Sequence, residues 1–575
     1  MRILHKNLCL LMLILISCPL SILAQNKTIT GTVRDAIDVV IGASVTVKGN
    51  SSVGTITDMD GNFKLSVPAS AKELIVSFIG YDNHTVIIGN KTHFDITLKE
   101  SSVMLEEVVA IGYATVKRKD LTGSVASVGG QELSKIPVSD VTQALSGRMA
   151  GVMVQQSEGA PGSTVSIRVR GGISITQSNE PLYVIDGFPS EDGMASLDPA
   201  EIETIDVLKD ASATAIYGAR GANGVVVIST KNGSKSHGKA TVTFDSYVGF
   251  KTLAKKLDVL SPYEFVRLDY ERTLWRMSTG DAGADGMTSW EKRYGKYSDI
   301  EANYANRPGI NWQDEALGRT ALTQNYRVAV SGKTEKMNYS LAYSFYNEEG
   351  AMVYSGTKKH NISFNMNHEV NKWLTVNSRI SYDQRRVEGM GTSGDSDRFN
   401  KMQHILQYRP TIGIQGTDAE LLAGEDPILA DDSGNVMQNP LISAAEEIND
   451  REWRTFQANG GATIKLLKGL SFRSTVGMLY QTRRNDVFYG AESQTAKRSS
   501  IKGTITNLEN NSFQTSNVLT YAWNNKIHDI TAMVGHEFIS KWARSFSAGA
   551  TQFPNDEIGL GDLSLGTPST PTSSE

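Results

Sequence analysis

The sequence predicts a mainly β protein with three parts: an N-terminal β-sandwich, a small α/β domain, and an antiparallel sheet of the kind that forms transmembrane barrels. Three observations predict this fold class. Short alternating runs fill residues 26–100, buried-strand candidates alternate with short helices in residues 120–233, and runs of about ten residues with one apolar and one polar face fill residues 239–575. A chain of 575 residues also exceeds what one hydrophobic core supports, so several domains are expected.

Composition narrows the function classes. The formal net charge of -5 gives no indication of a nucleic-acid partner. The two cysteines, Cys9 and Cys18, both fall in the leading segment, so the mature chain lacks the thiols for disulfides, a cysteine nucleophile or cysteine-ligated zinc. After that segment, no apolar run approaches the roughly 18 to 20 residues of a spanning helix. A membrane location would therefore require strands.

Residues 1–24 have the pattern of a signal peptide. Arg2 and Lys6 precede an apolar run at residues 8–16, and Ala24 stands at a plausible cleavage point. A lipoprotein signal is the alternative, in which cleavage would leave a lipidated Cys18. We expect the leading segment to be removed on export.

Residues 26–100 contain seven short β-prone runs separated by glycine, asparagine or Asp-Gly turns, which predict a small antiparallel sandwich. The run Asp58-Met59-Asp60-Gly61 is similar to the start of a calcium loop. Because no glutamate stands at the twelfth position of that loop, a hairpin turn is favoured.

Residues 104–119 form an apolar, β-prone segment that ends in the basic run Lys117, Arg118 and Lys119. Such a segment can add as an extra strand to the sheet edge of a partner, or it can be an ordinary interdomain strand. The residue pattern alone leaves both readings open. The basic run is typical of a solvated linker.

Residues 120–233 predict a compact α/β domain. A strand is expected at 121–128, a helix at 140–149 after the cap Ser139, and further strands at 152–157, 164–170, 182–185, 203–208 and 224–230. Asp198 can cap a turn that begins with Pro199, and Asp210 can cap a helix at 211–217. We expect Gly218 to end that helix.

Turn glycines follow in the same stretch. Asp186-Gly187 and Asn223-Gly224 predict tight turns. Gly218, Gly221 and Gly224 follow a helix and precede a strand, the reverse of the order that places a helix N-terminus on a phosphate, so a nucleotide site is rejected. The signature residues of the domain are Asp186, Gly187, Asp198, Pro199, Asp210, Tyr217, Gly218, Gly221 and Gly224.

From residue 239 the pattern changes to two-residue alternation. Apolar side chains at Met337, Tyr339, Leu341, Tyr343 and Phe345 alternate with polar or small ones. Runs of this length cross a bilayer as tilted strands with lipid outside and a polar interior. Nine strands are predicted, near 240–250, 322–332, 336–346, 360–370, 373–384, 453–466, 470–482, 512–523 and 527–540.

The links between these strands alternate between tight turns and long loops, as in outer-membrane barrels, whereas a soluble sandwich has no reason to keep that asymmetry. Barrels that enclose a plug use about 22 strands, so the chain is expected to be the N-terminal part of a longer protein. A helix capped by Ser261 is predicted in the first long loop. Its aromatic residues could touch a ligand, although packing against the barrel rim is favoured: Tyr263, Phe265, Tyr270 and Trp275.

The motifs VIDGFP, DPAEIETIDVLKDASATAIYG and GARGANGVVVISTKNG, in this order and spacing, resemble the plug domain of the SusC/RagA family of TonB-linked outer-membrane transporters. Residues 26–100 resemble the carboxypeptidase regulatory-like domain that often precedes such plugs. The resemblance implies that residues 120–233 are the plug, that 239–575 are the N-terminal portion of the barrel, and that residues 104–119 carry the TonB box. The residues implied for that box are Glu107, Val108, Val109, Ala110, Ile111, Gly112 and Tyr113.

The resemblance also implies a function: active import of oligosaccharides or other large nutrients across the outer membrane. The TonB-ExbB-ExbD complex would supply energy, a SusD-like surface lipoprotein would cover the barrel, and the sandwich and TonB box would face the periplasm. A peptide-importing relative and an exported β-rich adhesion or scaffold protein stay as alternatives. A signalling receptor usually needs a different N-terminal domain.

No catalytic constellation is found in the sequence. The nine histidines are scattered, and there is no HExxH or GxSxG motif. We therefore expect neither an enzyme nor a metal or cofactor site.

Overall fold

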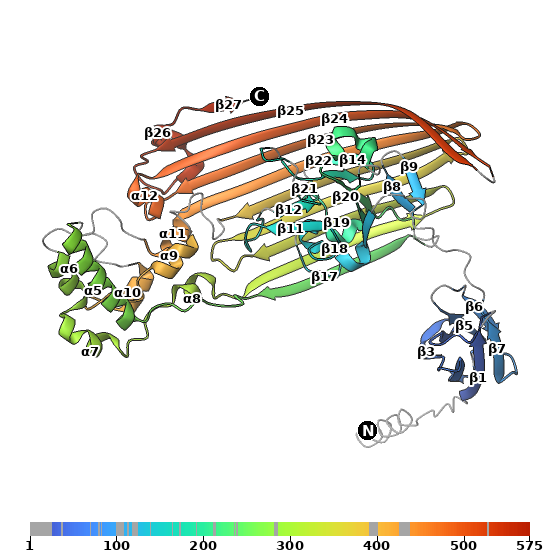
Figure 1. Cartoon of the computed structure of the whole chain (residues 1–575), viewed down its shortest axis with the longest axis horizontal. Coiled ribbons are helices and arrows are strands. Elements are labelled where there is room, and N and C mark those ends of the chain that lie inside the picture. Colours follow the sequence, from blue (N-terminus) through green and yellow to red (C-terminus); the bar gives the residue numbers. More distant parts are fainter. Residues whose placement is uncertain are drawn as a thin grey trace, which may run out of the picture. The chain divides into compact units, whose positions relative to one another are not determined.

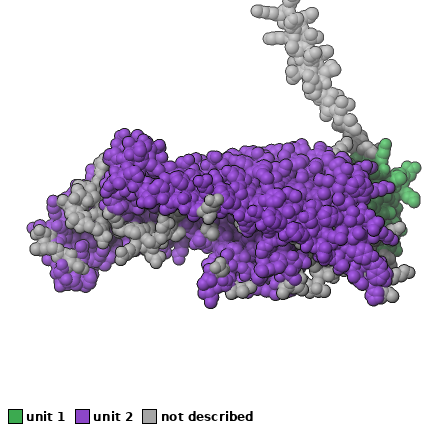
Figure 2. Space-filling view, turned by 90° about the horizontal axis from the view of Figure 1, so that it is seen from above, with its two compact units in different colours: residues 1–108 green, residues 109–575 purple. Residues whose placement is uncertain are grey.

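The computed structural model describes residues 26–574, apart from residues 36–37, 70, 79–80, 82, 99–107, 112–113, 118–124, 139, 164, 172–173, 177, 191–192, 211–213, 235, 237–239, 281–285, 390–400, 425–437 and 526–527. The chain divides into two compact units, residues 1–108 and residues 109–575 (Figure 2).

The first unit is a sandwich of two small sheets, with strand orders β4-β1-β7 and β3-β2-β5-β6. Ile29, Val45 and Leu74 are fully buried in its core. The strands are β1 (Asn26–Arg34), β2 (Ser44–Val47), β3 (Asn50–Ile56), β4 (Asn62–Pro68), β5 (Glu73–Ser77), β6 (His84–Ile87) and β7 (His93–Thr97). All seven predicted strands are present. The prediction of a purely antiparallel sandwich is wrong at one pair, since β1 and β7, which no tight hairpin joins, are parallel.

The Asp58 turn forms as predicted. The Asp58 carboxylate accepts hydrogen bonds from the backbone N–H groups of Asp60 (3.0 Å) and Asn62 (2.8 Å), and Gly61 takes a positive φ of 71°. The carboxylate therefore stabilises the turn between β3 and β4; because these strands lie in different sheets, the prediction of a turn is confirmed and that of a hairpin is wrong.

The second unit contains an α/β domain built on a five-stranded sheet of order β10-β15-β16-β13-β14, beside a β11-β12 hairpin. Ile185, Ile205 and Ile228 are fully buried in its core. Its strands are β10 (Val125–Gly129), β11 (Val152–Gln156), β12 (Val165–Val169), β13 (Leu182–Ile185), β14 (Phe188–Ser190), β15 (Ile202–Leu208) and β16 (Val225–Thr230), and its helices are α2 (Gly130–Leu133), α3 (Val141–Ala144), η2 (Pro199–Glu201) and η3 (Ala215–Gly221).

Two helix predictions in this domain need correction. The helix predicted at 140–149 is the short α3, and Asp140 caps it by accepting a hydrogen bond from Thr142 N at 2.7 Å; the predicted cap Ser139 lies outside the described residues. The helix predicted at 211–217 is the 3-10 helix η3. Gly218 lies inside it as a kink with a φ of 59°, because glycine tolerates a left-handed turn that the chain then continues past.

The rest of the second unit is one long antiparallel sheet with nine consecutive strands in chain order (Figure 1). They are β17 (Thr241–Lys251), β18 (Ala321–Lys333), β19 (Met337–Glu349), β20 (Gly356–Asn371), β21 (Leu374–Glu388), β22 (Glu447–Leu467), β23 (Leu470–Tyr489), β24 (Lys502–Asn524) and β25 (Asp529–Thr551). All nine predicted strands are confirmed. The short strands β26 (Thr567–Pro568) and β27 (Thr572–Ser574) pair with β25, and the sheet does not close on itself within the described residues.

The links alternate as predicted. Links of two to four residues join β18 to β19, β20 to β21, β22 to β23 and β24 to β25 at one end of the sheet. The links at the other end are longer, and those from β17 to β18, β21 to β22 and β23 to β24 carry helices. Figure 1 shows α5 (Pro262–Thr279), α6 (Gly286–Tyr294) and α7 (Ile300–Tyr304) beyond that second end. No helix among the described residues is both long and apolar enough to span a membrane.

Helix α5 begins at the predicted cap, and Ser261 and Glu264 form a reciprocal capping box. The expectation that its aromatic residues pack against the rim is wrong. Tyr263, Phe265 and Tyr270 pack instead on a separate core that α5 shares with α6 and α7, and Trp275 is exposed. The loop helices thus supply their own apolar partners. That core consists of Val266, Trp290, Tyr294, Ile300 and Tyr304.

Candidate functional site: the polar face of the large sheet and the α/β domain

The large sheet exposes its apolar face and buries its polar face. On β20, Asn361 and Ser363 are 0% and 2% exposed, whereas Ile362 between them is 46% exposed. On β21, Arg379 is 4% exposed and Ile380 is 44% exposed. A sheet in water shows the opposite preference, so the exposed apolar face is suited to lipid.

Aromatic side chains on the exposed face mark two levels along the strands. Tyr382, Phe456 and Tyr480 are cross-strand neighbours on β21, β22 and β23. Nearer the short turns, Phe472 lies on β23, eight positions from Tyr480, with Tyr521 on β24. Eight positions span roughly 27 Å along the strand at about 3.4 Å per residue, and a strand tilt of about 40° reduces this to roughly 21 Å of height, near the apolar band of about 25 Å that aromatic girdles flank in membrane barrels.

The α/β domain covers the polar face through side chains of the sheet that bond to its backbone. Lys359 Nζ donates to the carbonyl oxygens of Ala195 and Leu197, each at 2.7 Å. Asn361 Nδ2 donates to Ser196 O at 2.7 Å. The contact face is therefore polar on both sides.

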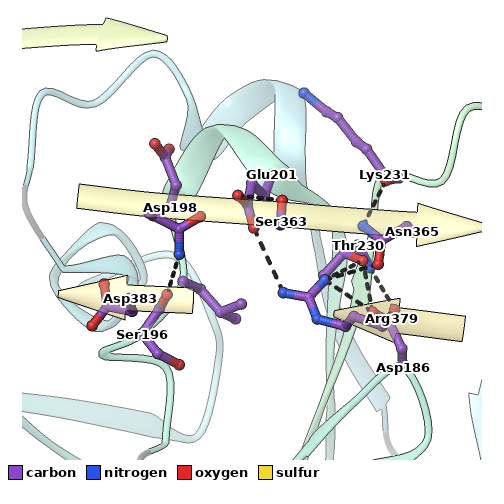
Figure 3. Close-up of polar contacts among 12 residues, drawn as sticks. Asp186, Ser196, Asp198, Glu201, Thr230, Lys231, Ser363, Asn365, Arg379 and Asp383 are labelled. Carbon is purple, nitrogen blue, oxygen red and sulfur yellow. Dashed lines mark hydrogen bonds and ion pairs between the residues drawn. The ribbon is translucent and has the colours of Figure 1, made fainter. Parts of the chain in front are cut away.

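An arginine of the sheet forms the centre of this contact. Arg379 reaches from β21 to the α/β domain, where it donates to Thr230 Oγ1 at 2.8 Å and to Asp186 Oδ2 at 3.2 Å (Figure 3). Its second terminal nitrogen lies 3.6 Å from a carboxylate oxygen of Glu201. One guanidinium group of the sheet thus faces two carboxylates of the α/β domain.

Both carboxylates have further partners. Asp186 accepts hydrogen bonds from the backbone N–H of Thr230 (2.8 Å) and from its hydroxyl (2.6 Å). Glu201 accepts one from the Ser363 hydroxyl of β20 at 2.7 Å. Burial raises the pKa of Glu201, and the charge of Arg379 opposes that rise.

The signature residues lie where the domain turns. Asp186 and Gly187 form the tight turn between β13 and β14, with φ of 51° and 89°, and the turn directs the Asp186 carboxylate to Arg379. Asp198 caps η2 by accepting from Ala200 N at 2.7 Å, and Pro199 occupies the first position of that helix. The prediction of these turn and cap roles is confirmed.

The remaining signature residues are structural in different ways. Asp210 forms an ion pair with Arg170 at 2.5 Å, while the residues it was predicted to cap, 211–213, lie outside the described residues. Tyr217 packs on the small apolar cluster around Val225. A Cβ at Gly221 would lie 2.9 Å from the Thr214 carbonyl oxygen.

Part of the predicted TonB-box segment is described. Val108–Ile111 form strand β8, which pairs with β9 (Ala114–Lys117). Glu107, Gly112 and Tyr113 lie outside the described residues. The segment thus has strand conformation, and its role stays a prediction.

The sequence reading missed Glu201, Lys359 and Arg379 as site residues. The signal that could have indicated them is the presence of charged residues on the buried polar face of β20 and β21. In the part of the chain that the structure describes, no group of three or more His, Cys, Asp or Glu residues could hold a metal ion.

Comparison with known proteins agrees with this geometry. The model of the TonB-dependent Receptor Plug Domain matches residues 117–225, and that of the CarboxypepD_reg-like domain matches residues 29–110. TonB-dependent receptor P26 of Formosa agariphila is 31% identical over 560 residues, covering 94% of the chain and 52% of that protein. TonB-dependent receptor SusC of Bacteroides thetaiotaomicron is 37% identical over 352 residues, covering 60% of the chain and 32% of SusC.

Among solved structures, the RagAB peptide importer in its open-open state is similar at 25% identity, with a TM-score of 0.66 over 81% of the chain and 53% of that protein. The chain spans about half the length of TonB-dependent receptor P26 and of the matched RagAB chain. The α/β domain is the plug, and the large sheet matches the barrel wall of these receptors. In its two matched domains, its relatives and its fold, the chain is similar to SusC/RagA-like TonB-dependent transporters over about half of their length.

Proposed function

We propose that this chain provides the plug and part of the barrel wall of an importer that carries nutrients across the bacterial outer membrane with energy from TonB. The observation that carries the proposal is the inverted sheet: its apolar face is exposed and its polar face is buried beneath the plug. A polar passage closed by a plug needs an energy source to open, and the outer membrane holds no ATP. The TonB-ExbB-ExbD complex is the source that the family resemblance implies.

The segment around β8 is the proposed point of attachment for TonB. A β-prone segment can extend the sheet of a partner through main-chain hydrogen bonds, and a pull on it would then reach the plug, which follows in the chain. In this proposal the TonB box comprises residues 107–113, and the sandwich and the box face the periplasm. The domain limits in the proposal are 26–100 for the sandwich, 104–119 for the box and linker, 120–233 for the plug and 239–575 for the wall.

Deleting residues 106–113 tests the energy-coupling role. Uptake should fall to background while the amount of protein at the cell surface stays unchanged, because the deleted segment contributes nothing to the wall. Uptake is measured with a labelled nutrient in whole cells, and surface display with an antibody against a loop tag. Normal uptake by the deletion variant would contradict the coupling role.

A matched pair of substitutions sharpens this test. Val109→Pro removes a backbone N–H that strand addition needs, whereas Val109→Thr keeps both the N–H and the β propensity. We expect the proline variant to lose uptake and the threonine variant to retain it. Equal uptake by both would show that main-chain pairing at Val109 is not required.

The cargo and the surface partner belong to the same proposal. The family resemblance implies an oligosaccharide or another large nutrient as cargo, and the similar RagAB structure, which is a peptide importer, supports a peptide as the alternative. A SusD-like lipoprotein is the proposed lid over the helix-bearing end. The chain is proposed to have no catalytic activity. An exported adhesion or scaffold protein is the alternative, and recovery of the mature protein in culture medium rather than in outer-membrane detergent extracts would favour it.

A further inference from the structure

Two arginines flank a tryptophan on the polar face of the sheet. Arg385 on β21, Trp453 on β22 and Arg483 on β23 are consecutive cross-strand neighbours. The guanidinium carbon of Arg385 lies 4.4 Å from the centroid of the indole ring, and that of Arg483 lies 5.1 Å from it. Cation–π attraction on this scale holds both guanidinium groups in place.

Neither guanidinium is neutralised. Within the described part of the chain, Arg385 and Arg483 have no carboxylate within ion-pair distance, and the Nε atom of each is buried without a hydrogen-bond partner. Asp383, two positions before Arg385 on the same face, forms an ion pair with Lys359 at 3.9 Å. Two neighbouring positive charges that are half-buried repel each other, and an anion that hydrogen-bonds to the two guanidinium groups beside the indole ring would lower that cost.

The next residue on each of these two strands is also an arginine, and it differs in having an ion-pair partner. Arg386 and Arg484 follow Arg385 and Arg483 in the sequence and lie on the exposed face, where each has a carboxylate partner. Arg386 pairs with Asp450 at 2.7 Å, and Arg484 with Asp486 at 2.8 Å. Among these four arginines, only the two on the polar face thus lack a carboxylate partner.

The surroundings suit a polar solute that meets the plug. Arg385 lines a small crevice with Gln143 and Ser163 of the plug. Asp140 also lines it, but its carboxylate is occupied in capping α3. On the plug side of the arginines, Thr455, Gln481 and Asn510 form a hydrogen-bonded row, with distances of 3.1 Å. A ligand held by the arginines would therefore have amide and hydroxyl partners beside it.

We propose that Arg385 and Arg483, held apart by Trp453, bind an anionic group of the cargo, a carboxylate or a sulfate. Guanidinium groups bind such groups with paired, charge-assisted hydrogen bonds. The proposal rests on the proposed function, because it assumes that cargo passes along this face. It selects acidic cargo over neutral cargo, and both an acidic oligosaccharide and an acidic peptide carry the required chemistry.

The test is binding to the purified full-length protein in detergent, which needs no energy from TonB. The probes are an oligogalacturonate and its methyl ester, which share one skeleton, and an aspartate-rich peptide and its asparagine counterpart. For at least one skeleton, the charged member should bind about tenfold or more tightly than the neutral member, since several charge-assisted hydrogen bonds are at stake. The preference should decline as salt is added. Preference in the sugar arm names an oligosaccharide as the source, and preference in the peptide arm names a peptide.

The matched variants are the double changes R385Q/R483Q and R386Q/R484Q. The first should abolish the preference for charged probes, and the second, on the opposite face, should retain it. Trp453→Leu should weaken the preference while leaving binding of the neutral probes unchanged. No charge preference in the wild-type protein, or its survival in R385Q/R483Q, would overturn the proposal. These binding measurements test the anion site, whereas uptake by the variant that lacks residues 106–113 tests the import function. Failure of one proposal is therefore distinguishable from failure of the other.

Discussion

Arg379 shows how much the contact between the plug and the large sheet depends on one side chain. It is almost completely buried and faces Asp186 and Glu201, which belong to different turns of the plug. A buried ion pair adds little stability over an apolar pair of the same shape, but removal of one partner leaves an uncompensated charge. The residue therefore specifies where the plug sits more than it stabilises the fold.

Arg379→Met should lower the stability of the plug against urea by about 3–5 kcal/mol, because two carboxylates then lose their cation. Glu201→Gln should cost much less. It keeps an acceptor for the Ser363 hydroxyl, and it removes a charge whose pKa burial already raises. The measurement is urea unfolding of both variants in detergent, followed by hydrogen exchange in the plug. An equal loss of stability in the two variants would argue against a larger contribution from Arg379 than from the charge of Glu201.

Sequence reading could not find this cluster, for a physical reason. Arg379 and Glu201 are far apart in the chain, and a charged residue on the polar face of a barrel strand is expected to face water. The turn at Asp186 was predicted from its own neighbours, since Asp-Gly favours that backbone. Its use as an acceptor for Arg379 depends on tertiary structure alone. Local chemistry was thus predictable, and the partners were not.

At the scale of elements, alternation predicted all nine strands but not their ends. β24 begins at Lys502 and β25 ends at Thr551, about ten residues beyond the predicted limits. These extensions lie past the apolar band, where both faces of a strand meet polar surroundings. Without a difference between the faces, the two-residue pattern disappears although the hydrogen-bonded ladder continues.

The apolar band predicts how substitutions on β23 depend on depth. Val476→Arg should destabilise the folded protein by about 2–4 kcal/mol, because the charge falls between the two aromatic levels. Thr482→Arg, on the same face but beyond Tyr480, should cost about 0–1 kcal/mol. Urea titration of protein refolded into lipid vesicles measures both. Similar costs at the two positions would contradict the placement of the band.

A loop contact between α11 (Pro440–Glu446) and the segment after β25 should depend on pH. Burial, and then a hydrogen bond with Asp556, raises the pKa of Glu446, whereas a hydrogen bond from Ala491 N lowers the pKa of Asp556. The contact is strongest with Glu446 protonated and Asp556 ionised. Its stabilisation is therefore present in mildly acidic solution and is lost as the pH rises through the raised pKa of Glu446.

The protection factors of amides around residues 490–493, which compare each exchange rate with the intrinsic rate at the same pH, should accordingly be higher at pH 5 than at pH 7.5. Glu446→Gln, which supplies a permanent donor, should keep these protection factors high at both pH values. Equal protection factors at pH 5 and pH 7.5 in the wild-type protein would rule out a shared proton at this contact.

At the scale of the whole molecule, the described residues combine a sandwich, a plug and nine strands of wall. The motifs of the plug carried the family resemblance, and the comparisons confirm it. Cargo could not be read in the same way, because the residues that would contact it, such as Arg385 and Arg483, come together only through strand register. Deletion of residues 106–113 and the paired arginine changes test function at this scale, one through energy supply and the other through selectivity.

Water can replace the hydrogen bonds that hold the plug against the sheet. Serine, asparagine, lysine and arginine side chains of the wall hold it, and the net worth of a typical hydrogen bond is only about 0.5–1.5 kcal/mol. An apolar interface would have to separate in a single step. This interface is polar, so each hydrogen bond that breaks can be replaced by one to an entering water molecule. In the proposed importer, the mechanical work of displacing the plug would thereby be spread over many small steps.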